Sequence, residues 1–341
     1  MGRHRDHDRA ASARRRACPE SAVKRLAGVM LLGACVCAGA ADVPRSGLAQ
    51  ADAALQAGEA DRALSVLNAM PNSAEAHLLR CRVYFTEERW DDAVNECDTA
   101  VRLDGQNAQN HLWLARALGE KADAVSFLSA FNLAKRSRAE FEQAASLDPS
   151  DAETLSDLGE FYSSAPGVVG GGNDKAQGLV PQLQKIEPAR AHVLLGRIAE
   201  SAKDYATAER EYKLATMNNQ HPAFAWMTLA SFYRKRERWN DMQSAVDSGY
   251  KAAQHDRGAG VALYNGAAVL IKGKRNLALA AKMLEEYLAN YPKSEEAPAF
   301  QAHTRLARLK AQLGDKNGAW QEKAAALNLA HDYKPAQGLS F

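Results

Sequence analysis

The chain has 341 residues, of which 46% are hydrophobic and 25% charged, so it can form two ordinary domains or one long repeat array around an apolar core. Its formal charge of +2 hides an uneven distribution. Residues 1–40 carry eight basic and three acidic side chains, whereas the rest of the chain carries 35 basic and 38 acidic ones. A mildly acidic body without a basic stripe argues against nucleic acid as the main partner.

The first 40 residues have the pattern of an export signal. A basic stretch precedes an apolar run over residues 26–38, which is too short to cross a bilayer because that takes about 20 residues. Ala38-Gly-Ala40 is a small-x-small cleavage site, whereas Leu32-Gly-Ala-Cys35 resembles a bacterial lipobox and would make Cys35 an acylated first residue. We expect an exported, periplasmic protein that is either soluble or held to the membrane by a lipid anchor alone. An uncleaved basic tail is the alternative.

The rest of the chain repeats one pattern. His77 and His111 are 34 residues apart, and His192 and Trp226 are again 34 apart. Alanine is abundant and β-branched runs are rare, which favours helix. A small residue recurs twelve positions after another in several units, which would let two antiparallel helices approach closely. These pairs are Ala51 and Ala63, Cys81 and Ala93, Gly196 and Ala208, and Ala307 and Ala319.

These spacings resemble the tetratricopeptide repeat (TPR) family over residues 46–336. The resemblance implies an all-α, right-handed superhelical solenoid of about eight antiparallel hairpins that binds a protein or peptide partner in its concave groove. Units would start near residues 46, 74, 108, 151, 189, 223, 260 and 300. The chain has no Gly-x-Ser-x-Gly, His-Glu-x-x-His or paired Cys-x-x-Cys pattern, so we expect neither an enzyme nor a cofactor.

Two units are longer than the period. The spacing from Ala115 to Ser137 is ten residues longer than the usual twelve, and that from Leu158 to Ala176 is six longer. We expect extended hairpins at 108–150 and 151–188, with both helices of the first one lengthened. With Leu147-Asp-Pro149, these features resemble exported bacterial TPR proteins and, more distantly, the periplasmic T component of TRAP-type transporters. That likeness implies an alternative function, a transporter accessory that binds a small hydrophobic or anionic molecule.

The glycine-rich stretch over residues 167–172 invites interpretation as a phosphate-binding loop. Gly167 and Gly172 have the required separation, but Asn173 and Asp174 follow, so Lys175 is displaced by two positions and no hydroxyl comes next. We interpret the stretch as a widened turn whose next helix is capped by Asn173 or Asp174, with an anion-binding loop as the alternative.

Histidines and cysteines raise two further questions. His77, His111, His192 and His303 share one position in their units. Because stacked helices lie about 10 Å apart and metal–nitrogen bonds are about 2 Å long, we expect a packing position rather than a metal site. Cys81 and Cys97 are either two buried thiols or a disulfide, which needs Cα atoms within about 7 Å.

The helices expected to line the groove carry an apolar stripe flanked by arginines, with aromatic residues deeper in. Such a surface suits an amphipathic ligand, either a peptide with an acidic end or a lipid-like carboxylate. The alternative is that the leucines form hairpin core and the arginines are merely solvated. The candidate binding residues are Leu78, Arg82, Phe85, Leu112, Arg116, Leu155, Tyr162, Val193, Arg197, Met227 and Arg234. We expect any specialised site in the third and fourth units, walled by Phe127, Phe131, Tyr162, Pro166 and the Gly170–Gly172 turn.

Overall fold

The computed structural model describes residues 42–217 and 220–341, which belong to one compact unit that runs from Ala40 to Phe341. The expected export segment over residues 1–40, with Cys35, lies outside the described residues. In the described part every regular element is a helix, and the only extended pairing is an isolated bridge between Ser294 and Ala297. The all-α class is therefore confirmed.

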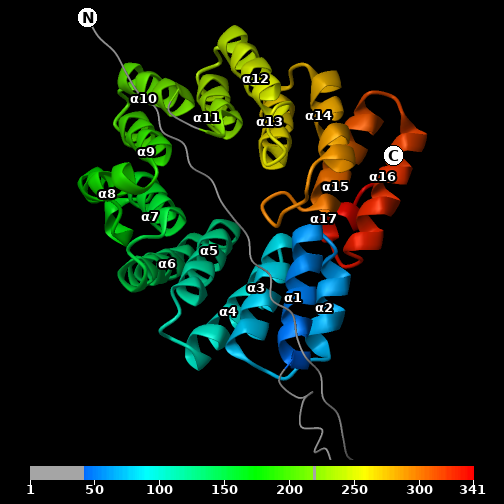
Figure 1. Ribbon diagram of the computed structural model, residues 1–341. Coiled ribbons are helices and arrows are strands. Elements are labelled where there is room, and N and C mark those ends of the chain that lie inside the picture. Colours follow the sequence, from blue (N-terminus) through cyan, green and yellow to red (C-terminus); the bar gives the residue numbers. More distant parts are fainter. Residues whose placement is uncertain (1–41, 218–219) are drawn as a thin grey trace, which may run out of the picture. The chain divides into compact units, whose positions relative to one another are not determined.

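The helices follow one another as antiparallel pairs (Figure 1). The eight hairpins of the described residues are α1 (Asp42–Ala57) with α2 (Ala60–Asn68), α3 (Ala74–Thr86) with α4 (Trp90–Leu103), α5 (Ala108–Ala124) with α6 (Phe127–Leu147), α7 (Ala152–Ser164) with α8 (Asn173–Ile186), α9 (Pro188–Ser201) with α10 (Tyr205–Met217), α11 (Pro222–Lys235) with α12 (Trp239–Ala253), α13 (Gly260–Gly273) with α14 (Leu277–Asn290), and α15 (Ala299–Gln312) with α16 (Lys316–Leu329). A short helix, α17 (Lys334–Gln337), follows the last hairpin.

Small residues sit where the two helices of a hairpin meet. Ala51, Ala63, Ala307 and Ala319 are all fully buried, as the spacing of twelve predicts. In the second hairpin the same position brings Cys81 within 5.3 Å of Cys97, Cα to Cα, and the two cysteines form a disulfide. The question that the sequence left open is thus answered by a bond between α3 and α4.

The repeated histidines join the two helices of their own hairpins. In each case Nδ1 contacts a glutamate oxygen at 2.6–2.9 Å, always nineteen residues further on except in the third hairpin, where the separation is 29. The pairs are His77 with Glu96, His111 with Glu140, His192 with Glu211, and His303 with Glu322. The position is structural, and the described residues contain no group of three or more potential ligands placed to hold a metal.

The ten extra residues of the third unit are helical. α5 and α6 have 17 and 21 residues, whereas α3 and α4 have 13 and 14. Only Val125 and Ser126 connect α5 to α6, so both helices are lengthened, as we expected. No described helix is both long and apolar enough to span a membrane.

The glycine-rich stretch forms a turn with its own hydrogen bonds. The short 3-10 helix η1 (Gly167–Val169) leads to Gly170, whose φ of +95° favours glycine, and the backbone N–H of Gly172 donates to the Tyr162 carbonyl at 2.8 Å. Lys175 Nζ donates to the Gly170 carbonyl. The expected cap is wrong in detail: Gly172 is the N-cap of α8, and Asp174 lies in its first turn. The interpretation as a turn holds because the Gly172 N–H and the Lys175 ammonium, which a bound phosphate would need, already donate to protein carbonyls.

The two ends of the array meet, whereas a solenoid usually has contacts only between neighbouring repeats. Figure 1 shows α1–α3 beside α15–α17. Arg82 donates from Nε and Nη2 to both carboxylate oxygens of Glu295 at 2.8 and 2.7 Å. The Tyr333 hydroxyl donates to Glu88, and the Gln301 amide donates to the Thr86 carbonyl. Residues more than 200 positions apart are thus joined by direct hydrogen bonds.

The junction also has an apolar core. Phe300 and Tyr333 are buried in one cluster with Leu55 and Leu67 of the first hairpin. Each such side chain contributes about 2 kcal/mol of burial free energy. Gly58, with φ of +74°, makes the approach possible, because a Cβ there would lie 2.5 Å from the Ala299 nitrogen. The terminal hairpins therefore cover each other, and neither needs a separate polar cap.

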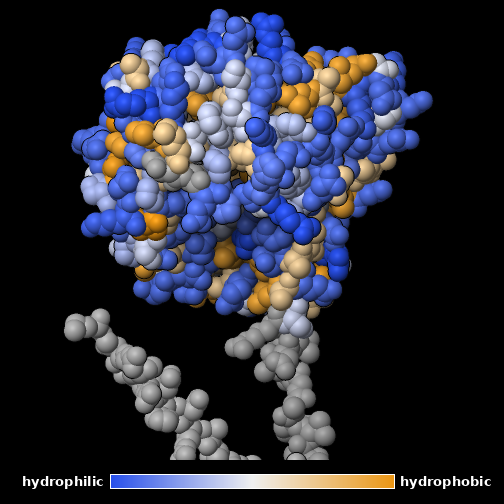
Figure 2. All heavy atoms as spheres, turned by 45° about the horizontal axis from the view of Figure 1, so that its top comes forward, coloured by the Kyte–Doolittle hydropathy of each residue, from blue (hydrophilic) through white to orange (hydrophobic). Residues whose placement is uncertain are grey.

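The face turned forward in Figure 2 is mostly hydrophilic, with hydrophobic residues in several separate groups. A binding site is therefore expected in a cavity between hairpins rather than on this face.

Candidate ligand-binding cavity

A cavity of about 840 Å³ lies against the third and fourth hairpins, and we call it the acidic cavity. Ligand sites usually have volumes of about 300–1,000 Å³, so its size suits a ligand. Its charged and aromatic lining residues are Phe85, Trp113, Arg116, Glu120, Asp123, Phe141, Glu153, Asp157, Glu160, Phe161, Arg190, Phe224, Glu295 and Glu296. They come from α3, α5, α6, α7, α9, α11 and the segment before α15, so helices distant in sequence build one cavity.

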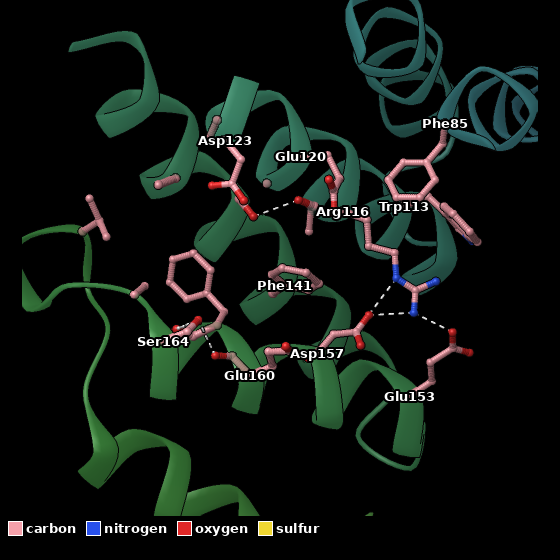
Figure 3. A pocket seen from close by; sticks show the side chains of 18 of the residues that line it. Phe85, Trp113, Arg116, Glu120, Asp123, Phe141, Glu153, Asp157, Glu160 and Ser164 are labelled. Carbon is pink, nitrogen blue, oxygen red and sulfur yellow. Dashed lines mark hydrogen bonds and ion pairs between the residues drawn. The ribbon is translucent and has the colours of Figure 1, made fainter. Parts of the chain in front are cut away.

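Arg116 is held in place in this cavity. Its Nε donates to Asp157 at 2.7 Å and its Nη2 to Glu153 at 2.5 Å, while its guanidinium lies 4.7 Å from the Trp113 ring centre. Figure 3 shows the side chain between Trp113 and the two carboxylates. Burial alone would lower the pKa of Arg116, but Asp157 and Glu153 hold that pKa above its ordinary value. Arg116 therefore stays charged and positions the neighbouring acids.

Acidic side chains outnumber basic ones in this cavity. Seven carboxylates and two guanidinium groups line it. Four of these carboxylates have an arginine partner: Glu153 and Asp157 pair with Arg116, Glu295 pairs with Arg82, and Glu160 pairs with Arg197. Across the described residues, no hydrogen bond or ion pair to a protein group engages the other three, Glu120, Asp123 and Glu296. All three are solvent-exposed, and the cavity carries more negative than positive charge.

Aromatic side chains form the rest of the wall. Phe85 packs edge-to-face on Trp113 with ring centres 5.4 Å apart, and Phe141 lies 6.3 Å from Phe161. Figure 3 places Phe141 between Glu120 on one side of the view and Glu160 on the other. The wall thus combines flat apolar faces with carboxylates.

A second cavity, of about 230 Å³, has the opposite charge, and we call it the basic cavity. It is lined by Arg197, Arg234, Lys235 and Lys272, with Glu200 as its single acid. Lys235 pairs with Glu200 at 3.2 Å, whereas the buried Nε of Arg234 has no partner among the described residues. Its walls come from α9, α10, α11 and α13.

The residues predicted to bind a ligand fall into different groups. Leu112, Leu155 and Met227 are buried in the core, while Leu78 and Val193 are partly buried beside it. Tyr162 is buried and donates its hydroxyl to Glu142. The apolar stripe is thus largely hairpin core.

The predicted arginines do not share one site. Arg116 and the aromatic Phe85 line the acidic cavity, Arg234 lines the basic cavity, and Arg82 joins the ends of the array. Arg197 pairs with Glu160 and lines the basic cavity. Most of these guanidinium groups are engaged by protein carboxylates, so their role in binding a ligand stays a prediction.

The residues expected to wall a specialised site lie in different places. Pro166 lines the acidic cavity, but Phe127 is 82% exposed at the tip of α6, and Phe131 lies beneath Lys135. Glu120, Asp123 and Glu296 were not among the residues predicted to bind a ligand. For the first two a signal exists, because they lie one and two turns after Arg116 on a lengthened helix. For Glu296 none exists, since closure of the array brings it there.

Comparison with known proteins gives similarities to solved structures alone. No protein-family model and no curated protein matches the chain. Among solved structures, the crystal structure of a thermophilic TPR protein of Thermus thermophilus is similar, with 17% sequence identity and a TM-score of 0.45, over 56% of this chain and 97% of that one. The TPR-like character of the present fold rests on its own geometry: α3 and α5 begin 34 residues apart, as do α9 and α11.

Proposed function

We propose that this chain is a non-enzymatic, exported helical-repeat scaffold that holds a peptide segment of a protein partner in the acidic cavity. The observation that carries the proposal is the cavity itself, whose volume of about 840 Å³ suits a bound chain segment and whose wall comes from five successive hairpins and the segment before α15. Helical repeats of this kind position side chains along an extended inner surface, and that arrangement supports binding rather than bond chemistry.

Site-specific photo-crosslinking tests the location of the partner. A photoreactive phenylalanine replaces Phe161 in the acidic cavity or, as the control, Phe127 at the exposed tip of α6. We expect a discrete protein adduct from position 161 and none of that mass from position 127. Equal adducts at both positions, or none at position 161 in the native envelope, would overturn the proposal.

Export is supported by two features. Residues 1–40 have the basic and apolar pattern of a leader, and Cys81 and Cys97 form a disulfide, a bond that persists in oxidising compartments such as the periplasm. The full chain, expressed in a bacterium, should appear in the envelope fraction. Its mass should match a chain whose first residue is Ala41 or an acylated Cys35. A full-length chain in the cytosol with free thiols would contradict export.

A transporter accessory that binds a small molecule is the second candidate. The closed junction favours it, because Arg82 and Glu295 join the ends and restrict entry of a long chain. Its outcome in the same experiment differs: position 161 gives no protein adduct, and native mass spectrometry of the purified protein detects a bound small molecule.

A further inference from the structure

We infer that the acidic cavity binds a ligand through a positively charged nitrogen group, an ammonium or a guanidinium, that sits among its carboxylates and aromatic faces. The inference rests on the proposed function in one respect only, namely that the cavity is the binding site. It reverses the polarity that the sequence alone suggested, which was a ligand with an acidic end.

The surplus of carboxylates in the acidic cavity favours a cationic ligand. Glu120, Asp123 and Glu296 line the cavity without a basic partner among the described residues. The two arginines of the wall make their printed contacts elsewhere, because Arg116 is engaged by Glu153 and Asp157, and Arg190 pairs with Glu187 outside the cavity. They act on Glu296 only through space. Glu120, Asp123 and Glu296 are solvent-exposed, so water and salt screen them. A cation that enters would still meet three carboxylates without a direct partner, and the electrostatic energy favours its binding.

The carboxylates also affect one another. Burial first, and then the charges of Asp123, Glu88 and Glu160, raise the pKa of Glu120. Burial first, and then the charge of Glu153, raise the pKa of Glu296, while Arg116 and Arg190 oppose the rise. Like charges that are held together destabilise one another until a cation joins them, and such clusters are typical of binding sites.

The aromatic side chains of the acidic cavity favour a cation independently of its carboxylates. Phe85, Trp113, Phe141, Phe161 and Phe224 line the same cavity. Trp113 already takes guanidinium groups on its ring, because the Arg116 and Arg82 carbons lie 4.7 and 5.5 Å from its centre. Aromatic faces attract cations within about 6 Å, and most strongly where water is excluded. Because those arginines already occupy Trp113, the faces open to a ligand are those of Phe161, which is half-buried, and Phe224, which is 49% exposed. With the carboxylates of the same cavity they suit a lysine or arginine side chain, or an aliphatic polyamine.

Isothermal titration of the mature protein tests the inference with three probes: a short lysine- and arginine-containing peptide, a peptide of the same length with glutamates in their place, and spermidine. We expect the basic peptide to bind and the acidic peptide to bind at least about tenfold more weakly, which corresponds to about 1.4 kcal/mol. Raising the salt concentration should weaken binding of the cation.

Two variants assign the effect to the cavity. The double variant Glu120→Gln with Glu296→Gln keeps the shape of both side chains and should reduce the affinity for the basic peptide at least about tenfold. Lys272→Gln, in the basic cavity, is the matched control and should leave that affinity unchanged. Thermal unfolding of both variants verifies that they remain folded.

The outcomes separate the inference from the proposed function. Binding of spermidine without the basic peptide supports the cation site and overturns the peptide scaffold. Tighter binding of the acidic peptide, or an affinity for the basic peptide that the double variant does not change, overturns the cation site. Photo-crosslinking at position 161 would still support the scaffold in that case.

Discussion

The acidic and basic cavities lie in the same array and are assembled in different ways. The basic cavity is built by α9, α10, α11 and α13, which belong to three successive hairpins. The acidic cavity takes Glu295 and Glu296 from the segment before α15, in addition to residues of five successive hairpins from α3 to α11. One site therefore depends on local repetition, and the other depends on the meeting of the two ends.

This difference has a consequence for stability and binding. Neighbouring hairpins fold and stack with only local contacts, so the basic cavity should survive any change that breaks the junction between the two ends of the array. The acidic cavity should lose part of its wall when Glu295 and Glu296 move away. Breaking the junction is thus the most direct way to separate the two sites experimentally.

Arg82→Glu should have the largest effect. The substitution removes the two hydrogen bonds to Glu295 and brings like charges together beside Asp52. Removing one partner of a buried ion pair costs about 3–5 kcal/mol, and because both side chains here are only partly buried we expect about 3 kcal/mol. Urea unfolding measures the loss, and hydrogen exchange should rise in α1–α3 and α15–α17 while α9–α13 stay protected.

Arg62→Glu is the matched control for that variant. Its side chain is 59% exposed, and its partner Glu59 lies three residues away in the same hairpin. Exposed pairs of this kind contribute less than about 1 kcal/mol. Equal losses in both variants, or faster exchange throughout the array, would show that the junction is not a separate unit.

Glu87→Gln should change the pH dependence of the junction. The Glu87 side chain is fully buried between α3 and α4, and its Oε1 has no partner among the described residues. Burial raises its pKa to about 7, Arg89 opposes the rise, and Asp61 and Asp332 add to it. The folded state therefore holds a proton that the unfolded state loses near pH 4.5, so stability should fall as pH rises from about 4.5 to about 7.

Glutamine does not ionise, so the variant lacks this titration. A pKa difference between 4.5 and about 7 corresponds to about 3 kcal/mol at most. We expect Glu87→Gln and the parent to be equally stable near pH 4, and the variant to be the more stable by up to that amount near pH 8. Glu75→Gln, an exposed position on α3, should leave the curve unchanged. Parallel curves for Glu87→Gln and the parent would disprove the assignment.

Local features of the molecule could be predicted from the sequence. The spacing of twelve between Ala51 and Ala63 identified the helix contacts, and the ten extra residues after Ala115 were correctly placed in longer helices. Such features depend on residues close in sequence, because helix periodicity and close packing leave a repeated trace. The same reasoning explains why the turn at Gly170 was interpreted correctly.

The features that depend on the whole array could not be predicted. No periodicity in the sequence tells that Arg82 meets Glu295, since the two lie 213 positions apart. The charge of the acidic cavity also depends on side-chain partners that the sequence does not show, because a predicted stripe of arginines suggests an anion only while their partners are unknown. Once Arg116 and Arg197 are seen to face carboxylates, the surplus charge of the acidic cavity is negative.

We expect the histidine–glutamate contacts to stabilise the hairpins of the two cavities to different degrees. His111 joins α5 to α6, two helices that line the acidic cavity, and His192 joins α9 to α10, two helices that line the basic cavity. The His111 side chain is the more buried, and its second ring nitrogen lies 3.1 Å from the Gly105 carbonyl. We expect His111→Gln to cost about 2 kcal/mol and His192→Gln about 1 kcal/mol in urea unfolding, since hydrogen bonds to charged groups contribute about 1.5–3 kcal/mol when buried. A double-mutant cycle with Glu140→Gln should recover most of the His111 loss as coupling, and additive losses would show that this contact does not stabilise the hairpin.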